Sequence, residues 1–403
     1  MICIIFVAIK THLHRMESFS FSKTETILLL IAALFLIIQT VYYLYIYNRI
    51  YCRNKAMGQN GIHFTKEQPP ISVIISVRDE SRHLHECLTS ILSQDYPQFE
   101  VIVINDGDND DSENIILPLE NQYNNLYHSF VPDTSRYLSR KKLALTIGVK
   151  AAKYDWIVVT EPNCMPASNQ WLKTLARNFT SRTEVVLGYS NYKYDKSWTN
   201  RCIGFDNLFQ SMRYLGFALL GKPYMGIGRN MAYRKELFYQ QKGFSAHLNL
   251  QRGDDDLFIN QIANKENTRV ETAPEAIVQT SNVEMARDWY TEKIGYAGTA
   301  ALLKGSQQLL LGAETASRLL FHACWVAALV IGIVQGHWLV VAVSVLFDLI
   351  KWGMQGAVIN LTAKALDEPR RYYLTLPIFD FLQPLQSLCW KVCSRFKKSG
   401  PRV

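Results

Sequence analysis

An uncharged apolar run restricts the fold of this chain more than any other feature. From Ile27 to Tyr47 the sequence reads ILLLIAALFLIIQTVYYLYIY, and about 20 apolar residues in a helix span the hydrocarbon layer of a bilayer. Arg49, Arg53 and Lys55 follow directly, and such basic residues mark the cytoplasmic end of a transmembrane helix. A cleaved signal peptide is excluded because the run is too long and no small-residue cleavage site follows it.

A second apolar region begins near Leu319, breaks at Gln335-Gly336-His337, and then resumes. Two apolar segments around a tight polar break predict a transmembrane helical hairpin over residues 319–363. Asp348 and Lys351 lie three residues apart within it. We expect these two side chains to pair on one face of the helix.

The C-terminal tail mixes aromatic residues and prolines and ends in the basic sequence RFKKSGPR. A spanning helix there would place this basic end outside, so we predict an interfacial helix and a cytoplasmic tail over 364–403. The net charge of +8 is then a membrane-surface feature that attracts anionic lipids. Nucleic acid is not an expected partner, because no basic stripe with interleaved stacking residues occurs.

The eight cysteines are scattered without a CxxC pair. This pattern suggests neither a zinc site nor a disulfide framework, and it fits a reduced cytoplasmic compartment. The sequence therefore predicts an integral protein of the inner or cytoplasmic membrane whose central domain lies in the cytoplasm.

The central region alternates between apolar strands and helices. Strands such as ISVIISV (71–77) and FEVIVIND (99–106) are each followed by a helical pattern, which predicts an α/β domain with a mostly parallel sheet. The expected organisation is an N-terminal anchor and linker (1–66), the α/β domain (70–285), a connecting segment (286–318), the hairpin (319–363) and the tail (364–403).

Polar side chains follow the strands at their carboxyl ends, where ligands bind in parallel α/β sheets. They are Arg78, Asp79 and Glu80 after the first strand, Asn105, Asp106 and Asp108 after the second, and Glu161 and Asn163 after the third. Other phosphate-binding motifs fail, because GIGRNM lacks the third glycine of a dinucleotide fingerprint and no GxxxxGK[ST] occurs.

Three adjacent carboxylates, Asp254, Asp255 and Asp256, open a predicted helix after Gly253. Crowded acids raise one another's pKa, which suits a general base that works near neutral pH. Asp255 is the favoured base, with Asp254 positioning the acceptor and Asp256 capping the helix. The alternative is that the acids only stabilise the helix start through its dipole.

The glycine-rich segment MGIGRNMAYRK (225–235) offers small residues beside which a ligand can approach the backbone. Arg229 and Asn230 supply hydrogen-bond donors for an anionic ligand. For Gly226, a tight turn into a strand explains the sequence equally well.

These motifs, over residues 71–305, resemble the membrane-associated family 2 inverting glycosyltransferases of GT-A fold. The resemblance implies that Asp106 contacts the nucleotide base, with Asp108 as a second candidate, that Glu80 lies near the nucleoside, and that Lys142 lies near the nucleotide. The base motif of the family falls on Asp254-Asp255. Asn105 departs from the acid that is commoner at its position.

The metal motif of the family falls on Thr160-Glu161-Pro162-Asn163-Cys164. The resemblance implies Mn²⁺ or Mg²⁺ as cofactor, because a divalent cation offsets the charge that develops on a diphosphate leaving group. Glu161 is the expected metal ligand together with Asn163, and because Asn163 is neutral we expect the metal ion to bind weakly when no nucleotide is present. The alternative is that both residues cap a helix that opens near Pro166.

The leading interpretation is the transfer of one sugar from a nucleotide-sugar donor, a UDP-sugar first, to a lipid-linked or glycan acceptor. Processive relatives carry Gln-x-x-Arg-Trp, whereas here Glu292-Lys293-Ile294-Gly295-Tyr296 follows Trp289. This favours a single transfer, with Tyr296 stacking on an acceptor sugar. A processive synthase and a catalytically inactive partner protein are the alternatives.

Overall fold

The computed structural model describes residues 21–59, 61–78, 81–106, 111–132, 139–281 and 286–396. The chain divides into two compact units. The helical unit comprises Met1–Tyr45, Leu309–Asn360 and Tyr372–Cys389, and the sheet unit comprises Ile46–Gln308, Leu361–Arg371 and Trp390–Val403.

The sheet unit is built on a seven-stranded sheet with the strand order β3-β2-β1-β4-β8-β6-β9. Its strands are β1 Ile71–Val77, β2 Phe99–Asn105, β3 Leu126–Phe130, β4 Trp156–Thr160, β6 Val185–Gly188, β8 Met231–Arg234 and β9 Thr268–Glu271. The strands from β3 to β4 are parallel, and β8 is antiparallel to both β4 and β6. The predicted α/β class with a mostly parallel sheet is confirmed.

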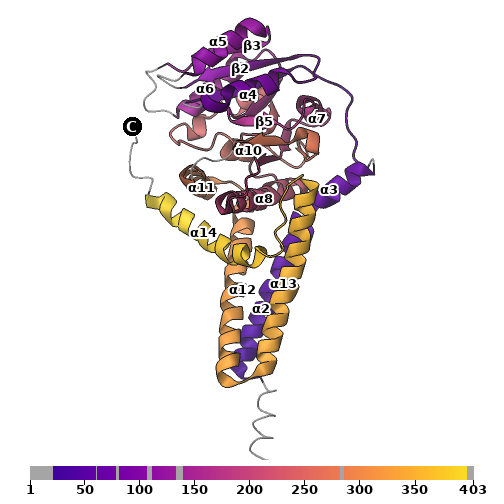
Figure 1. The fold of residues 1–403 in the computed structure, drawn as a ribbon, viewed down its shortest axis with the longest axis vertical. Helices are drawn as coiled ribbons and strands as arrows, with labels where there is room; N and C mark the ends of the chain where they lie inside the picture. The colour runs from indigo at the N-terminus through magenta and orange to yellow at the C-terminus, as the bar shows by residue number, and fades with distance from the viewer. Residues whose placement is uncertain are drawn as a thin grey trace, which may run out of the picture. The chain divides into compact units, whose positions relative to one another are not determined.

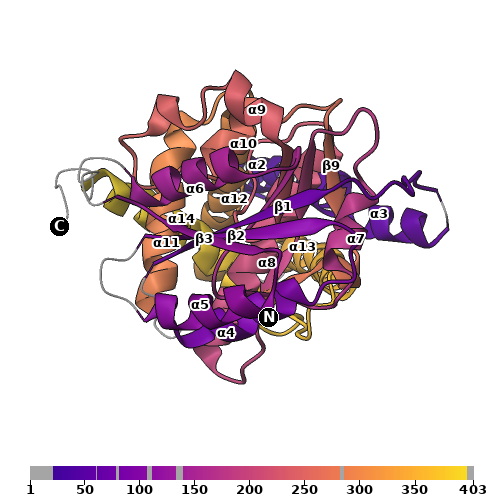
Figure 2. The ribbon, with the colours of Figure 1, turned by 90° about the horizontal axis from the view of Figure 1, so that it is seen from above.

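The first two strands are buried along nearly their whole length, as their β-branched sequences predict. Their register pairs Ile71 with Phe99 and Val77 with Asn105, so their carboxyl ends coincide. Helices α4 (Ser81–Leu92) and α5 (Ser112–Gln122) lie on one side of these strands, and α6 (Arg140–Ala151) lies on the other (Figure 2).

Helix α6 packs close to the sheet because Gly148 has no side chain. A Cβ at Gly148 would lie 2.5 Å from Cγ2 of Ile74 on β1, well inside van der Waals contact. Gly148 therefore allows α6 to pack directly against β1.

A second sheet of three strands has the order β5-β10-β7. It consists of β5 Cys164–Pro166, β7 Ser190–Tyr192 and β10 Val278–Thr280. The residues after Glu161 therefore continue as a strand, and the next helix begins only at Trp171, so capping of a helix near Pro166 does not explain this motif.

The remaining helices of the sheet unit are α3 Arg49–Gly58, α7 Trp171–Ala176, α8 Trp198–Leu219, α9 Lys235–Gln240, α10 Asp256–Ile262 and α11 Ala286–Thr299 (Figures 1 and 2). Short 3₁₀ turns occur at Ser245–His247, Pro274–Ala276 and Ala300–Leu302. The 22-residue α8 is buried over most of its length. The sequence pattern did not predict α8, because a helix buried on all sides has no amphipathic period.

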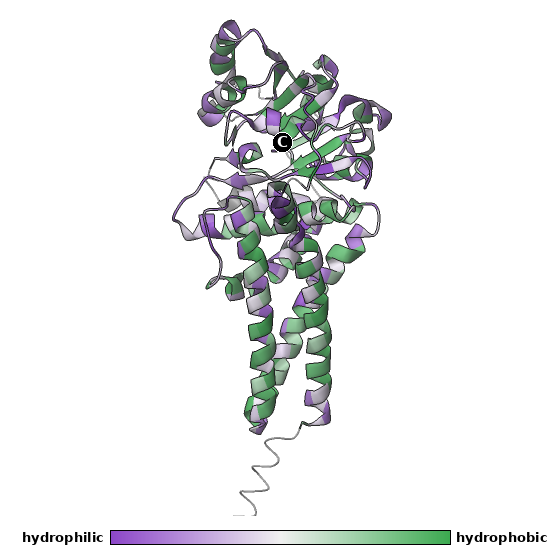
Figure 3. Cartoon of the chain, turned by 90° about the vertical axis from the view of Figure 1, so that its right-hand side faces the viewer, coloured by the Kyte–Doolittle hydropathy of each residue, from purple (hydrophilic) through white to green (hydrophobic). Residues whose placement is uncertain are grey.

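The helical unit contains α2 Lys23–Val41, α12 Gln307–Gln335 and α13 Trp338–Ala365. A π-helical turn at Tyr42–Tyr47 connects α2 to α3. Three helical stretches, Lys23–Gly58, Gln307–Gln335 and Trp338–Ala365, are long and apolar enough to cross a membrane. Figure 3 shows the apolar residues that run along α2, α12 and α13.

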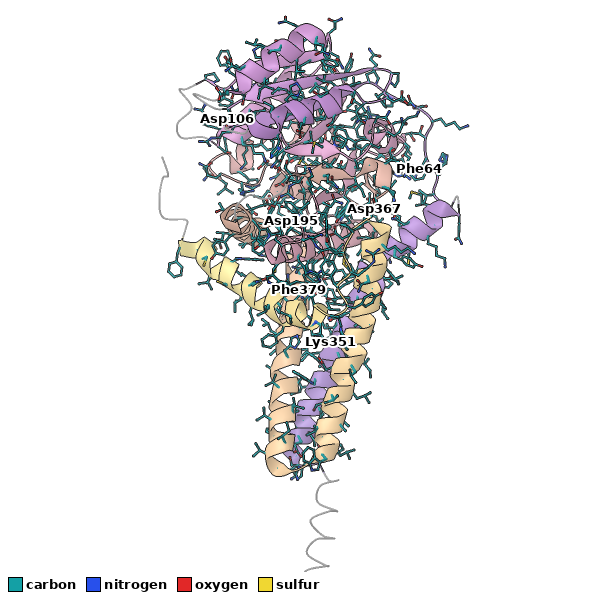
Figure 4. All side chains as sticks on the ribbon, in the orientation of Figure 1. Phe64, Asp106, Asp195, Lys351, Asp367 and Phe379 are labelled. Carbon is teal, nitrogen blue, oxygen red and sulfur yellow. The ribbon has the colours of Figure 1, made fainter. Side chains whose placement is uncertain are left out.

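The last helix, α14 (Leu376–Phe396), has an exposed apolar face. That face includes Ile378, Phe381, Leu382, Leu385, Leu388, Val392 and Phe396. Its buried Asp380 accepts hydrogen bonds from Lys351 and Gln355 of α13, and Figure 4 shows Lys351 within this unit. The ion-pair partner of Lys351 is therefore Asp380 of another helix, whereas the sequence suggested Asp348.

Candidate active site

Asp106 lies at the carboxyl end of β2 (Figure 4). Its carboxylate accepts a hydrogen bond of 2.6 Å from Nε of Arg140, and Nη2 of the same guanidinium donates to the Asp106 carbonyl. The backbone N–H of Asp106 donates to the carbonyl of Val77 at 2.7 Å. Arg140 thus holds Asp106 at the strand end. Glu80 and Asp108, also expected near the nucleotide, lie outside the described residues.

Glu161 follows β4, and both of its carboxylate oxygens have cationic partners. Nζ of Lys141 lies 3.1 Å from Oε1, and Nε of Arg229 lies 3.3 Å from Oε2. Burial would raise the pKa of Glu161, but Lys141 and Arg229 outweigh it and lower that pKa to about 2. Glu161 is therefore ionised at any ordinary pH.

Asn163 lies two residues further, in the turn before β5. Its backbone carbonyl accepts hydrogen bonds from the N–H and the hydroxyl of Ser281, at 2.9 and 2.8 Å. Its side-chain oxygen accepts a weak hydrogen bond from Cys164 Sγ at 3.4 Å. The main chain of Asn163 thus anchors this turn to the segment that follows β10.

Asp255 is the N-cap residue of α10, where its Oδ1 accepts the N–H of Asp256 at 2.7 Å. Its other oxygen, Oδ2, accepts the N–H of Gly228 at 3.1 Å and the hydroxyl of Tyr296 at 2.6 Å. Burial and the neighbouring Asp254 raise the pKa of Asp255 above its usual value. A carboxylate with a raised pKa is a better proton acceptor, which suits the expected role of base.

Asp256, which we expected to cap the helix, instead belongs to its first turn. It accepts hydrogen bonds from the N–H of Leu257 and the hydroxyl of Thr299, and burial and Asp255 raise its pKa to about 7. The turn into these acids requires glycine, because Gly253 has φ +104° and a Cβ there would lie 2.7 Å from Cδ1 of Leu257.

The two adjacent lysines of α6 have different surroundings. Nζ of Lys142 donates to the carbonyls of His247, Leu250 and Arg252 at 2.5, 2.9 and 2.8 Å, and burial lowers its pKa to about 8. Lys142, expected near the nucleotide, thus ties down the loop before the three aspartates. The neighbouring Lys141 lies between Glu161 and Asp254, with its Nζ 3.1 Å from each carboxylate.

Gly228 lies between the two motifs. A Cβ there would be 3.8 Å from Oδ2 of Asp255 and 4.0 Å from Oε1 of Glu161. A single methyl group at this residue would therefore be in ordinary van der Waals contact with both carboxylates. Gly226 differs, because its Cβ would lie 3.0 Å from Cγ1 of Ile259 and 3.2 Å from Cδ2 of Leu187 in the core.

The other two residues expected from the glycine-rich segment, Arg229 and Asn230, lie in different places. Arg229 extends to the site, where its Nη2 contacts both oxygens of Glu292 at 2.7 and 2.6 Å. Asn230 is buried, and its amide bonds the indole of Trp171 and the carbonyls of Tyr189 and Ala276. Both hydrogens of that amide thus bind main-chain carbonyls, and the structure does not bring it to the carboxylates.

Helix α11 contributes Glu292 and Thr299, which the sequence motifs did not identify, and Tyr296, which was expected at the acceptor. Glu292 contacts Arg229, Tyr296 contacts Asp255, and Thr299 contacts Asp256. These three residues recur at intervals of four and three, so they lie on one face of the helix. That spacing is the local signal that could have linked Glu292 and Thr299 to Tyr296.

The residues present do not fit a preformed divalent metal site. Among the residues that the structure describes, no group of three or more His, Cys, Asp or Glu side chains lies together where it could hold a metal ion. Both oxygens of Glu161 are engaged by cations, and Asn163 is a neutral ligand. A divalent ion would have to displace Lys141 and Arg229 to reach Glu161.

The sequence of this region matches a known family of proteins. The family model described as Glycosyl transferase family 2 matches residues 72–241, which contain the strand ends, Glu161 and the glycine-rich segment. These residues therefore resemble a family 2 glycosyltransferase domain.

Curated relatives support this assignment. Poly-beta-1,6-N-acetyl-D-glucosamine synthase of Staphylococcus epidermidis is 27% identical over 126 residues, which are 31% of this chain and 28% of that protein. Glycosyltransferase AglE of Haloferax volcanii is 28% identical over 182 residues, 44% of this chain and 54% of that protein. The chain thus matches about a quarter to a half of these relatives.

A solved structure shares the fold. The mannosyltransferase PcManGT from Pyrobaculum calidifontis, in complex with GDP-Man and Mn²⁺, superimposes with a TM-score of 0.53 at 18% identity. The match covers 84% of this chain and 98% of that one.

Proposed function

We propose that this protein transfers one sugar from a nucleotide-sugar donor to an acceptor hydroxyl, with inversion at the anomeric carbon and with Asp255 as general base. The observation that carries the proposal is the approach of the Asp255 and Glu161 carboxylates to the same glycine, Gly228. An inverting transfer needs a base on the face of the sugar opposite the leaving diphosphate. The names of the relatives and the GDP-Man of PcManGT support a nucleotide-sugar donor.

In this proposal the donor sugar lies over Gly228 and the nucleotide extends toward Asp106, with Glu80 and Asp108 as further candidates to bind it. Lys141 and Arg229 offset the charge that develops on the diphosphate. Lys142 supports this arrangement indirectly, because it fixes the loop that leads to Asp254 and Asp255.

The acceptor hydroxyl takes the place of the Tyr296 hydroxyl at Oδ2 of Asp255. Asp255 then removes the acceptor proton as that oxygen forms the new bond to the anomeric carbon, and the bond to the diphosphate breaks. Asp254, whose Oδ2 pairs with Lys141, positions the acceptor side of the site. Mn²⁺ or Mg²⁺ would reach Glu161 and Asn163 only with the donor and after Lys141 and Arg229 had moved, so these steps use the chain's own side chains.

The membrane helices favour a lipid-linked or glycan acceptor at the cytoplasmic face. Arg49, Arg53 and Lys55 follow the first candidate span, and basic residues favour the cytoplasmic side. A reporter fused after Val403 should therefore be active only in its cytoplasmic form. A signal from an external reporter would mean that the tail crosses the membrane.

The test of the function is a donor assay with the purified full chain. The protein is incubated with a panel of UDP- and GDP-sugars, and release of the nucleoside diphosphate is measured with and without membrane lipid extract. We expect turnover with one donor class and none in Asp255→Asn. Turnover of no donor by the wild type, with nucleotide binding intact, would favour the alternative of an inactive partner protein, and long polymer products would favour a processive synthase.

A further inference from the structure

We propose that the ammonium group of Lys141 is the resident cation of this site and offsets the charge of the donor diphosphate, so that transfer requires no divalent metal. The inference rests on the proposed function and assigns one of its residues a role. It starts from the disagreement between the metal motif of the sequence and the contacts of that motif.

Lys141 lies between the metal motif and the base motif. Its Nζ lies 3.1 Å from Oε1 of Glu161 and 3.1 Å from Oδ2 of Asp254, so one ammonium joins the metal motif to the base motif. A divalent ion at this point would have the same two carboxylates as ligands. About a third of the Lys141 side chain, 35%, is exposed, which leaves donor capacity for a phosphate oxygen.

The side chain of Lys141 supplies a positive charge at this position. A lysine side chain carries a positive charge at neutral pH, and carboxylate oxygens of Glu161 and Asp254 lie 3.1 Å from its Nζ. Lys141 therefore places a positive charge beside both carboxylates. Of the neighbouring cations, Lys142 binds three carbonyls, whereas Arg229 binds Glu292 on α11 as well as Oε2 of Glu161.

The neutral Asn163 is consistent with a lysine as the cation of this site. The ammonium of Lys141 already lies between the carboxylates of Glu161 and Asp254, and a further carboxylate would repel a diphosphate that enters such a site. An acid at position 163 would only add repulsion, whereas Asn163 does not. A divalent ion would in turn be repelled by the ammonium of Lys141 at close range.

The experiment compares wild type, Lys141→Ala, Lys141→Arg and the control Lys150→Ala, which alters an exposed lysine at the other end of α6. Donor turnover is measured in EDTA and in Mn²⁺, and Mn²⁺ binding is followed by electron paramagnetic resonance without nucleotide. We expect wild type and Lys150→Ala to be equally active in both conditions and to bind no Mn²⁺.

Lys141→Ala should lose about 10²–10³-fold in EDTA, the usual cost of removing a preorganised charge-stabilising group. It should regain activity in Mn²⁺ and bind the ion, because Glu161 and Asp254 are then without their ammonium. Lys141→Arg should keep part of its activity in EDTA. The inference is overturned if the wild type is inactive in EDTA and active in Mn²⁺, or if the wild type binds Mn²⁺ in the absence of nucleotide. Inactivity of the wild type under every condition would count against the proposed function instead.

Discussion

Two ion-pair networks, one in each unit of the molecule, share a composition and differ in exposure. In the sheet unit the side chains of Lys141 and Glu161 are 35% and 27% exposed beside the bare backbone of Gly228. In the helical unit those of Lys351 and Asp380 are 1% and 6% exposed, and Nε2 of His322 lies 3.0 Å from the same carboxylate.

The difference teaches which buried charges mark a functional site. The helical network joins α12, α13 and α14, and its charged groups are surrounded by partners and packed side chains. The network of the sheet unit instead brings Glu161 and Asp254, which lies next to Asp255, together at Lys141, whose side chain is partly exposed. Partial exposure next to crowded like charges, rather than the presence of ion pairs, distinguishes the network of the sheet unit.

The largest expected effect comes from Asp255→Asn. Removal of the proposed base should lower transfer by about 10²–10⁴-fold, while the amide keeps the cap of α10 and the thermal midpoint changes little. Donor turnover and thermal unfolding measure the two quantities. Full activity in this variant, together with an inactive Asp254→Asn, would move the role of base by one residue.

The helical network should show the opposite pattern in Asp380→Ala. Loss of this carboxylate leaves Lys351 buried without its counter-charge, which costs about 3–5 kcal/mol of unfolding free energy. Denaturant unfolding in detergent measures the loss. The double variant Lys351→Met with Asp380→Leu should recover most of it, because it removes both charges. An Asp380→Ala protein that is fully stable but inactive would break the comparison.

Two glycines of one segment sharpen the comparison within the sheet unit. Gly228→Ala places a methyl group in the space between Asp255 and Glu161, with its nearest neighbour 3.7 Å away. We expect turnover to fall by about 10²-fold through displacement of the donor, with unfolding free energy unchanged within about 0.5 kcal/mol. Gly226→Ala, which crowds Ile259, should instead cost about 1–3 kcal/mol of stability.

The smallest effect is expected from Tyr296→Phe. The Tyr296 hydroxyl donates to the charged form of Asp255 and so lowers the pKa of that carboxyl. Without it the pKa of Asp255 rises further, and because the base acts deprotonated, the acidic limb of the pH–rate profile should move to higher pH. Tyr96→Phe, which removes a hydroxyl bonded to the Pro69 carbonyl, should leave the profile unchanged. An unshifted profile in Tyr296→Phe would exclude this contact during turnover.

Much of the fold followed from local patterns. Alternation of β-branched strands with helices predicted β1, β2 and β4, and the position of Glu161 and Asp106 at strand ends follows from the parallel arrangement. The nearness of Asp255 to Glu161 was implied only by the family resemblance, since 94 residues separate them, from 161 to 255. No periodicity records such a long-range contact.

Other features were missed for definite physical reasons. Lys141 and Lys142 are adjacent and chemically identical, so only the rotation of α6 against the sheet decides which one faces Glu161. Glu292 enters the site because α11 presents one face to Arg229 and Asp255. Asp380 lies 29 residues from its partner Lys351, beyond the reach of any helical spacing rule.

The stereochemistry of the first product tests the central claim most directly. Proton magnetic resonance can follow the anomeric signals when the purified chain acts on a donor whose sugar is α-linked to the diphosphate, with water or a lipid as acceptor. The account predicts that the β-anomer appears first and that Asp255→Asn produces neither anomer above background. An α-anomer as first product, or equal formation by Asp255→Asn, would contradict inverting transfer by Asp255.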